Sequence, residues 1–304
     1  MKKNATTLGL ENFGSVSYMN SLLQCMAHCR EISEKILTWY NYSKDNNKKS
    51  KQLSYSYAEL LDYLYSLNAS KGINNNYQKK YYSPRKFKEI IGKFNSLFQG
   101  IQIGDSKDII HFIIEKMNEE LNPLGGNVIN NNNTNDSDNI IIDKSNELLV
   151  FNKFRNNFNK YFHSFLSEYL YAILKTVTVC CTCNSMTFNF QAYNFLIFPL
   201  LQTKNYIMNN TQNRYFNAQN YVLNLYDCFK YFQKIDYFIG QNRSYCKKCE
   251  SFQNSYICNS LYNVPTILII VLDRGNNNND FKEKVNFDTK LDLSNFIEDK
   301  NIIL

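Results

Sequence analysis

Residues 8–29 read LGLENFGSVSYMNSLLQCMAHC, and this stretch carries the signals that decide the fold. From Ser17 onward, apolar side chains recur at spacings of three and four residues, which predicts one or two amphipathic helices. Serine is a favoured N-cap residue, so Ser17 is expected to cap the first of these helices. The apolar positions are Met19, Leu22, Leu23, Met26, Ile32, Ile36 and Leu37.

The composition predicts a folded chain. Of its 304 residues, 44% are apolar and 15% aromatic, which is enough to build the core of one large domain or two ordinary ones. The start of the chain lacks a signal-peptide pattern, and its apolar runs are too short to cross a bilayer. We therefore expect an intracellular protein, cytoplasmic or nuclear, without a membrane partner.

The formal charge of +7 is concentrated in the first third of the chain, where residues 1–104 hold 15 Lys and Arg against 7 Asp and Glu. Such a surface is able to attract nucleic acid. However, most of these cations lie in polar stretches typical of solvated loops, so a nucleic-acid partner is not expected.

Further along the chain, helical signals give way to strand signals. Residues 105–121 show helical spacing of apolar side chains, with Asp105 as the expected N-cap. Asp108 in the first turn is expected to accept from the backbone N–H of Asp105, as in a capping box. Residues 123–139 are rich in Asn, Asp and Gly, which predicts a mobile insertion. The later runs KTVTVC (175–180), MTFNFQAYNFLIF (186–198) and TILIIVL (266–272) predict strands, the last buried on both faces. Helices followed by sheet indicate the α+β class.

Two C-x-x-C pairs predict a metal site. Cys180 and Cys183 form one pair, and Cys246 and Cys249 form the other, with 62 residues between the pairs. A gap of two residues lets one turn present both sulfurs to the same tetrahedral zinc ion. The alternative to a zinc site is that buried cysteines are paired in the sequence by chance. Cys181 is spaced less well for zinc, and the cysteines without partner spacing are expected in the core. These are Cys25, Cys29, Cys228 and Cys258.

In combination, these segments resemble the ubiquitin-specific protease family, papain-like deubiquitinases with a thumb, a palm and zinc-bearing fingers. The first family box, G-L-x-N-x-G-x-T-C-Y-M-N-S-x-L-Q, is similar to residues 9–24. The next, F-x-G-x-Q-Q-x-D-S-Q-E-F, is recognisable in FQGIQIGDSKDII (98–110). NVPTILIIVLDR (263–274) and VNFDTKLDLSNF (285–296) resemble later family segments and follow in the family's order.

The resemblance implies an α+β, papain-like fold with three parts. Residues 1–122 would form the helical thumb with the nucleophile box, residues 123–147 an Asn-rich insertion, and residues 148–304 the fingers and an incomplete palm, all within one domain. It also implies a structural zinc ion held in the fingers by the two cysteine pairs. Ubiquitin or a ubiquitinated protein is the implied partner.

Two departures from the family pattern affect the expected chemistry. The family nucleophile is a cysteine, and Ser17 stands at its position. The family's general base is a His in a G-H-Y box beyond the LDLSNF segment, and the sequence ends at Leu304 before such a box. The histidines present lie in other contexts and are expected to be structural or at the surface. They are His28, His111 and His163.

Other family positions are retained. Asn12 matches the family's asparagine that donates to the developing oxyanion, and Asp105 lies near the family's channel for the ubiquitin tail, with helix capping as an equally open role. The resemblance implies thiol-dependent hydrolysis of ubiquitin conjugates. With Ser17 and without the His box, we expect an impaired or inactive domain that still binds ubiquitin. The alternatives are an active deubiquitinase completed by a C-terminal His box and a zinc-containing interaction module.

Overall fold

The computed structural model describes residues 8–43, 52–66, 81–102, 104–124, 147–210, 221–275 and 281–298. The chain divides into two compact units. Unit 1 comprises residues 1–129 and 162–169, and unit 2 comprises residues 130–161 and 170–304. The expected insertion, residues 123–147, lies almost entirely outside the described residues, and the division into thumb, insertion and fingers with palm stays a prediction.

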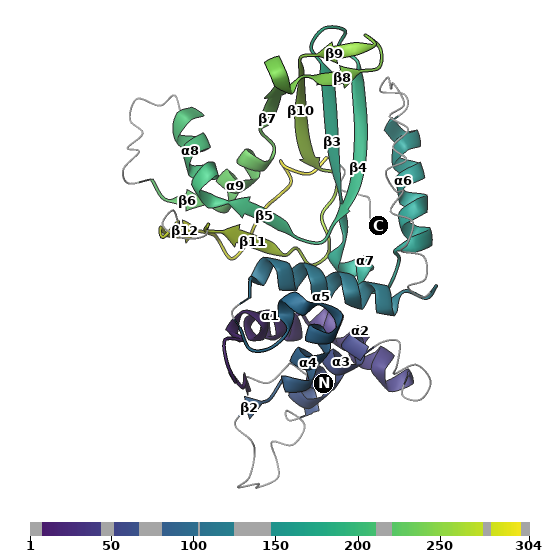
Figure 1. Ribbon diagram of the computed structural model, residues 1–304, viewed down its shortest axis with the longest axis vertical. Coiled ribbons are helices and arrows are strands. Elements are labelled where there is room, and N and C mark those ends of the chain that lie inside the picture. Colours follow the sequence, from purple (N-terminus) through teal and green to yellow (C-terminus); the bar gives the residue numbers. More distant parts are fainter. Residues whose placement is uncertain are drawn as a thin grey trace. The chain divides into compact units, whose positions relative to one another are not determined.

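Unit 1 consists mainly of helices (Figure 1). Their apolar residues face a shared core, so packing stabilises helices that would be marginal in isolation. Among the predicted apolar positions, Met19, Leu23 and Ile36 are fully buried, which confirms the helical spacing. The elements are β1 (Gly9–Leu10), α1 (Ser17–His28), α2 (Arg30–Tyr42), α3 (Gln52–Ser66), β2 (Tyr81–Tyr82), α4 (Arg85–Phe94), the short 3₁₀ helix η2 (Ser96–Phe98) and α5 (Ser106–Leu121).

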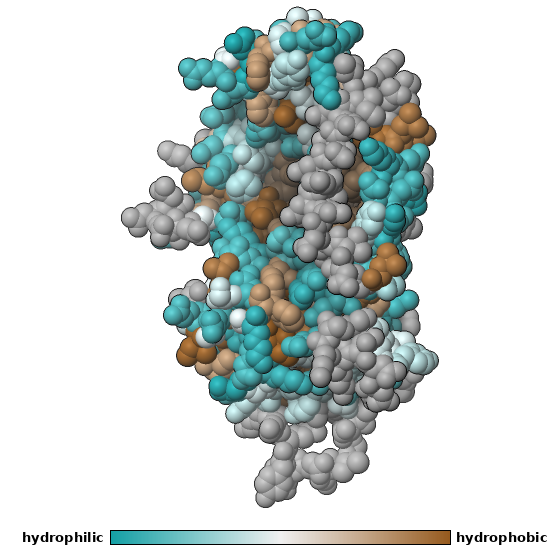
Figure 2. Space-filling view, turned by 45° about the vertical axis from the view of Figure 1, so that its right-hand side comes forward, coloured by the Kyte–Doolittle hydropathy of each residue, from teal (hydrophilic) through white to brown (hydrophobic). Residues whose placement is uncertain are grey.

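Hydrophilic residues cover much of the described surface in Figure 2, and hydrophobic residues appear there in small groups. Scattered apolar side chains of this kind are normal on folded proteins. Within the described ranges, the helices are too short or too polar to cross a membrane.

Helix α3 forms the centre of unit 1 and packs against α2, α4 and α5. Ten of its 15 residues are buried. Its first N–H groups have no acceptors within the helix, as at every helix start. The buried Glu120 of α5 provides the missing acceptors. Its two carboxylate oxygens accept from the N–H groups of Leu53 and Ser54 at 3.1 and 2.7 Å. A side chain of one helix therefore caps its neighbour.

We expect Glu120→Ala to lower the free energy of unfolding by about 2–4 kcal/mol, because it leaves two buried N–H groups without acceptors. Urea unfolding followed by circular dichroism measures the change. Glu119→Ala is the matched control, since Glu119 makes only a partly exposed ion pair with Lys116 at 2.9 Å and its loss is expected to cost about 0.5 kcal/mol. Equal effects of the two substitutions would contradict the capping role.

Unit 2 contains an antiparallel sheet with the strand order β4-β3-β10-β7 (Figure 1). Cys180 at the end of β3 lies opposite Ser255 of β10. Helix α6 packs along β4, where Phe151 contacts Phe190 with 5.4 Å between ring centroids. The elements are α6 (Glu147–Tyr161), β3 (Ala172–Cys180), β4 (Met186–Tyr193), β7 (Ile235–Phe238) and β10 (Ser255–Leu261).

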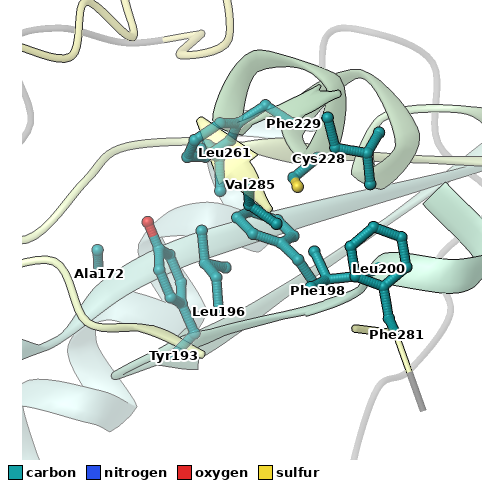
Figure 3. Close-up of a cluster of buried hydrophobic side chains, with 11 residues drawn as sticks. Ala172, Tyr193, Leu196, Phe198, Leu200, Cys228, Phe229, Leu261, Phe281 and Val285 are labelled. Carbon is teal, nitrogen blue, oxygen red and sulfur yellow. The ribbon is translucent and has the colours of Figure 1, made fainter. Parts of the chain in front are cut away.

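A second core of unit 2 gathers around two short parallel strand pairs, β11 with β5 and β12 with β6. Figure 3 shows its buried side chains, among which the rings of Phe198 and Phe229 meet edge to face at 5.0 Å. The elements are β5 (Leu196–Pro199), α8 (Leu200–Asn210), β6 (Leu223–Asn224), α9 (Leu225–Phe232), β11 (Ile270–Asp273) and β12 (Val285–Asn286). The short helix α7 (Ser167–Leu170) precedes β3 and belongs to unit 1 except for its last residue. Helices followed by sheet confirm the predicted α+β class.

The strand expected over residues 266–272 is shorter than predicted and not fully buried. Strand β11 covers Ile270–Asp273, and all four of its residues are only half-buried. The reason is its position, because within the described residues β11 pairs with β5 alone and has no second neighbouring strand. The prediction made from the unbroken apolar run therefore overestimated both the length and the burial of this strand.

Candidate functional site

The predicted nucleophile position is the first residue of α1. Val16 is the N-cap, and its carbonyl oxygen accepts from the N–H groups of Met19 and Asn20 at 3.1 and 3.0 Å. The prediction that Ser17 caps the helix is therefore wrong by one position, because the first helical carbonyl belongs to the fully buried Val16. Ser17 is exposed, and its hydroxyl makes no hydrogen bond with any described residue.

Two amides of α1 hold the segment that precedes it. The side-chain nitrogen of Asn20 donates to the carbonyl oxygen of Glu11 at 3.0 Å, and that of Gln24 donates to the carbonyl oxygen of Leu8 at 2.8 Å. Asn20 and Gln24 both belong to the family-like box, and this bonding gives them a structural role that the sequence did not reveal. The segment that leads to Ser17 is thereby held against α1.

Two glycines allow close approaches around this loop. A Cβ on Gly14, whose φ is +152°, would lie 2.7 Å from the Cβ of Ile101. A Cβ on Gly104 would lie 2.6 Å from the ring of Tyr18, whose hydroxyl accepts from the buried Lys88 ammonium at 2.8 Å. Larger residues at either glycine would displace the segments that flank Ser17.

Asn12 and Asp105, the other two candidates near this box, differ in their surroundings. Asn12 is exposed, and among the described residues its side chain has no hydrogen-bond partner. Asp105 is the N-cap of α5 and accepts from the N–H of Lys107 at 2.8 Å, which confirms the predicted capping. Asp108 lies in the first turn, but the reciprocal bond of a capping box is not formed there. The oxyanion and ubiquitin-tail roles stay predictions.

The three histidines are each engaged near their own position in the chain. Nδ1 of His28 lies 2.8 Å from the carbonyl oxygen of Gln24. Nε2 of His111 lies 3.2 Å from Glu115, and Nε2 of His163 lies 3.3 Å from Glu168. None of them forms a hydrogen bond with Ser17 in the described structure, so these contacts offer no imidazole to take its proton.

The four cysteines of the two C-x-x-C pairs meet in unit 2, at one end of the β3–β4 hairpin. Cys246 ends β8 (Ser244–Cys246), and Cys249 lies in the turn before β9 (Ser251–Gln253). The four sulfurs lie within 4.8 Å of one another, with 3.6 Å from Cys183 to Cys246 and 4.0 Å from Cys180 to Cys249. The two C-x-x-C pairs, which are far apart in the sequence, therefore lie together in the fold.

These positions fit a tetrahedral thiolate site. Zinc–sulfur bonds of about 2.3 Å give a tetrahedron with sulfur–sulfur edges of roughly 3.8 Å, close to the separations of the Cys183–Cys246 and Cys180–Cys249 pairs. The residues that follow each pair, Asn184 and Glu250, have φ of +55° and +52°. Both turns thus adopt the same left-handed conformation after their second cysteine. The hydroxyl of Ser185 contacts Cys183, and the pKa of that thiol is lowered to about 6, first by this hydrogen bond and then by one from the Ser185 backbone.

The other cysteines lie outside this cluster. Cys181 is exposed, and its N–H donates to the carbonyl oxygen of Asn254 at 2.9 Å. Cys228 is buried, as predicted. The core assignment is wrong for the exposed Cys25, which lies on the outer face of α1, and it overstates the burial of Cys29 and Cys258, which are half-buried.

Comparisons with known proteins agree with the family-like segments. Residues 8–302 match the family model described as ubiquitin carboxyl-terminal hydrolase. Ubiquitin carboxyl-terminal hydrolase 4 of Candida glabrata is 26% identical over 311 residues, covering 97% of this chain and 32% of that protein. The probable ubiquitin carboxyl-terminal hydrolase 1 of Schizosaccharomyces pombe is 35% identical over 129 residues, covering 41% of this chain and 14% of that protein. The chain thus spans about a third or less of these relatives.

Among solved structures, the chain resembles one described as the SAGA Ubp8/Sgf11/Sus1/Sgf73 DUB module bound to ubiquitin aldehyde. The TM-score is 0.63 at 16% identity, covering 98% of this chain and 55% of the other. Similarity at this level of identity concerns the fold, and it agrees with the helical unit and the sheet-containing unit described above.

Proposed function

Since the chain belongs to the ubiquitin carboxyl-terminal hydrolase family, we propose that it binds ubiquitin or a ubiquitinated protein and cleaves ubiquitin conjugates poorly or not at all. The observation that carries this proposal is the start of α1, where the family-like loop is kept in place while Ser17 occupies the nucleophile position.

The chemistry of serine supports the catalytic half of the proposal. A cysteine at the start of a helix gains thiolate character from the helix dipole, whereas a serine hydroxyl stays protonated near neutral pH. It then requires a well-aligned base. The Ser17 hydroxyl has no partner among the described residues. Asn12, exposed five residues before it, is free to donate to an oxyanion, but a donor without a nucleophile gives only a residual acceleration of hydrolysis.

The binding half is supported by the solved neighbours and by Asp105. Two structures with a TM-score of 0.63 are described as bound to ubiquitin aldehyde and to monoubiquitin. Asp105 corresponds to a family position near the channel for the ubiquitin tail. Its second carboxylate oxygen lies 3.6 Å from the Lys107 ammonium, and a carboxylate oxygen is able to accept a hydrogen bond from a bound peptide.

We also propose that the four-cysteine cluster holds a structural zinc ion. Cys180, Cys183, Cys246 and Cys249 would supply the four sulfurs, and their spacing supports this ligand set. Zinc so bound stabilises a fold without taking part in hydrolysis. The five cysteines outside the cluster form no disulfide, and we propose an intracellular location, cytoplasmic or nuclear, because thiols persist in reducing compartments.

Titration of isotope-labelled ubiquitin with the chain, followed by NMR, tests the binding. We expect chemical-shift changes that saturate at micromolar concentrations. Asp105→Asn keeps a capping oxygen for α5 but removes the charge, and it should weaken binding about tenfold, equivalent to ~1.4 kcal/mol.

Asp108→Asn, one turn along the same helix, is the matched control and should leave the affinity unchanged. Absence of any shift changes at high micromolar concentrations would overturn the binding proposal. Equal losses in both variants would remove Asp105 from the binding surface.

A further inference from the structure

Ser185 occupies a distinctive position beside the four-cysteine cluster. Its Oγ lies 3.1 Å from the sulfur of Cys183 and 3.4 Å from that of Cys246, so it reaches one sulfur of each pair. Its backbone carbonyl accepts from the N–H of Cys180 at 3.0 Å, which closes the turn of the first pair. The side chain is therefore placed by the turn that also places the ligands.

The direction of these hydrogen bonds depends on the state of the sulfurs. In free thiols either atom is able to donate. Once the sulfurs bind a metal they are thiolates, which only accept, so the hydroxyl must act as the donor. Its single hydrogen is then shared between, or alternates between, Cys183 and Cys246.

The Ser185 hydroxyl matters as a donor because a metal-bound cluster of four thiolates carries negative charge. Four thiolates and one divalent ion carry a net charge of −2, and two of the ligands, Cys180 and Cys246, are only 5% and 7% exposed. Buried charge of this size is costly unless hydrogen bonds distribute it. Besides Ser185, the N–H of Cys249 donates to the sulfur of Cys246 at 3.5 Å. For the Cys183 sulfur, the hydroxyl of Ser185 at 3.1 Å is the close hydrogen-bond donor.

We propose that Ser185 is a positioning residue of the metal site, whose hydroxyl donates to the thiolates of Cys183 and Cys246 and thereby tightens metal binding. This inference rests on the proposed zinc site. Groups that hydrogen-bond to metal ligands commonly alter affinity by about 10–100-fold when removed. A loss near the lower end is expected here, because the hydrogen is divided between two sulfurs.

A different reading is that Ser185 merely fills the turn. The pair Ser185→Thr and Ser185→Val separates the two readings, since these side chains have nearly the same shape and only threonine keeps the hydroxyl. Thr182→Ala serves as a second control. The Thr182 hydroxyl lies in the same turn but donates to the side-chain oxygen of Gln253 at 2.7 Å, away from the sulfurs.

Metal affinity is measured by competition between the purified chain and a chromophoric zinc chelator. The Val variant should bind zinc about tenfold more weakly than the Thr variant. Thr182→Ala should match the wild type. In the cobalt-substituted proteins, the sulfur-to-metal charge-transfer band of the Val variant should move to longer wavelength, because losing a hydrogen bond raises the energy of the sulfur electrons.

Equal affinities and equal cobalt spectra for the Thr and Val variants would overturn the proposal. A Thr182→Ala loss as large as that of the Val variant would also overturn it, because the effect would then follow from the turn. If the wild type binds no zinc, the proposed metal site fails and this inference with it. A wild type that binds zinc with unaffected variants refutes only the role of Ser185.

Discussion

A Cys246→Ser variant is expected to purify without stoichiometric zinc and to lose the ordered end of the β3–β4 and β8–β9 hairpins. The sulfur of Cys246 lies 3.6 Å from that of Cys183, and the residue is 7% exposed, so the substitution would replace one buried sulfur of the cluster by a hydroxyl. Structural zinc contributes an apparent stabilisation on the order of 10 kcal/mol in small zinc domains. Elemental analysis and hydrogen exchange over residues 180–186 and 244–253 measure the two consequences.

The matched control is Cys181→Ser, which changes the same atom within the first turn. Cys181 is exposed and lies outside the four-sulfur group. This variant should retain one zinc per chain and the exchange protection of the wild type. Zinc content lost equally from both variants, or retained in Cys246→Ser, would contradict the assignment of the ligands.

The second large effect is expected from Ser17→Cys. A ubiquitin with a thiol-reactive electrophile at its C-terminus should modify residue 17 of this variant faster than any residue of the wild type, by a factor on the order of 100. The thiol would stand at the first residue of α1, where the helix dipole favours the thiolate. Intact-mass kinetics followed by peptide mapping give the rate and the modified residue.

Ser15→Cys is the control, because Ser15 is exposed in the same loop but precedes the helix. Its modification should stay close to the wild-type rate. Comparable labelling of positions 15 and 17 would mean that the loop does not direct the electrophile. Rapid labelling of wild-type Ser17 would show an activated serine and contradict the proposed loss of catalysis.

The helices of unit 1 were predictable where their apolar residues follow a regular spacing. Residues 17–42 and 105–121 met this condition. Helix α3 did not, because Ser54, Ser56 and several tyrosines are buried beside its leucines and blur the polar face. Its start is capped by Glu120, which lies 66 residues away from Ser54 in the sequence. A contact across that separation leaves no local signal.

In unit 2, the strand-like runs located the strands but did not indicate the long-range contacts of their polar residues. Lys175, in the run KTVTVC, is 7% exposed and binds Glu147 of α6 at 2.9 Å as well as Glu298. Its partners lie 28 and 123 residues away, so no local pattern pairs them. The cysteine site was predictable, since ligand type and spacing carry the signal, whereas the Ser185 contact depends on how the turns fold.

The pairing of β3 with β10 has a consequence for how the chain is made. Cys180 lies opposite Ser255, so the sheet forms only after both strands have been synthesised. The 62 residues between the cysteine pairs take roughly 3–12 s to translate at about 5–20 residues per second. During that interval the first two thiols exist without their partners, and the four-sulfur cluster is complete only after residue 249 has been added.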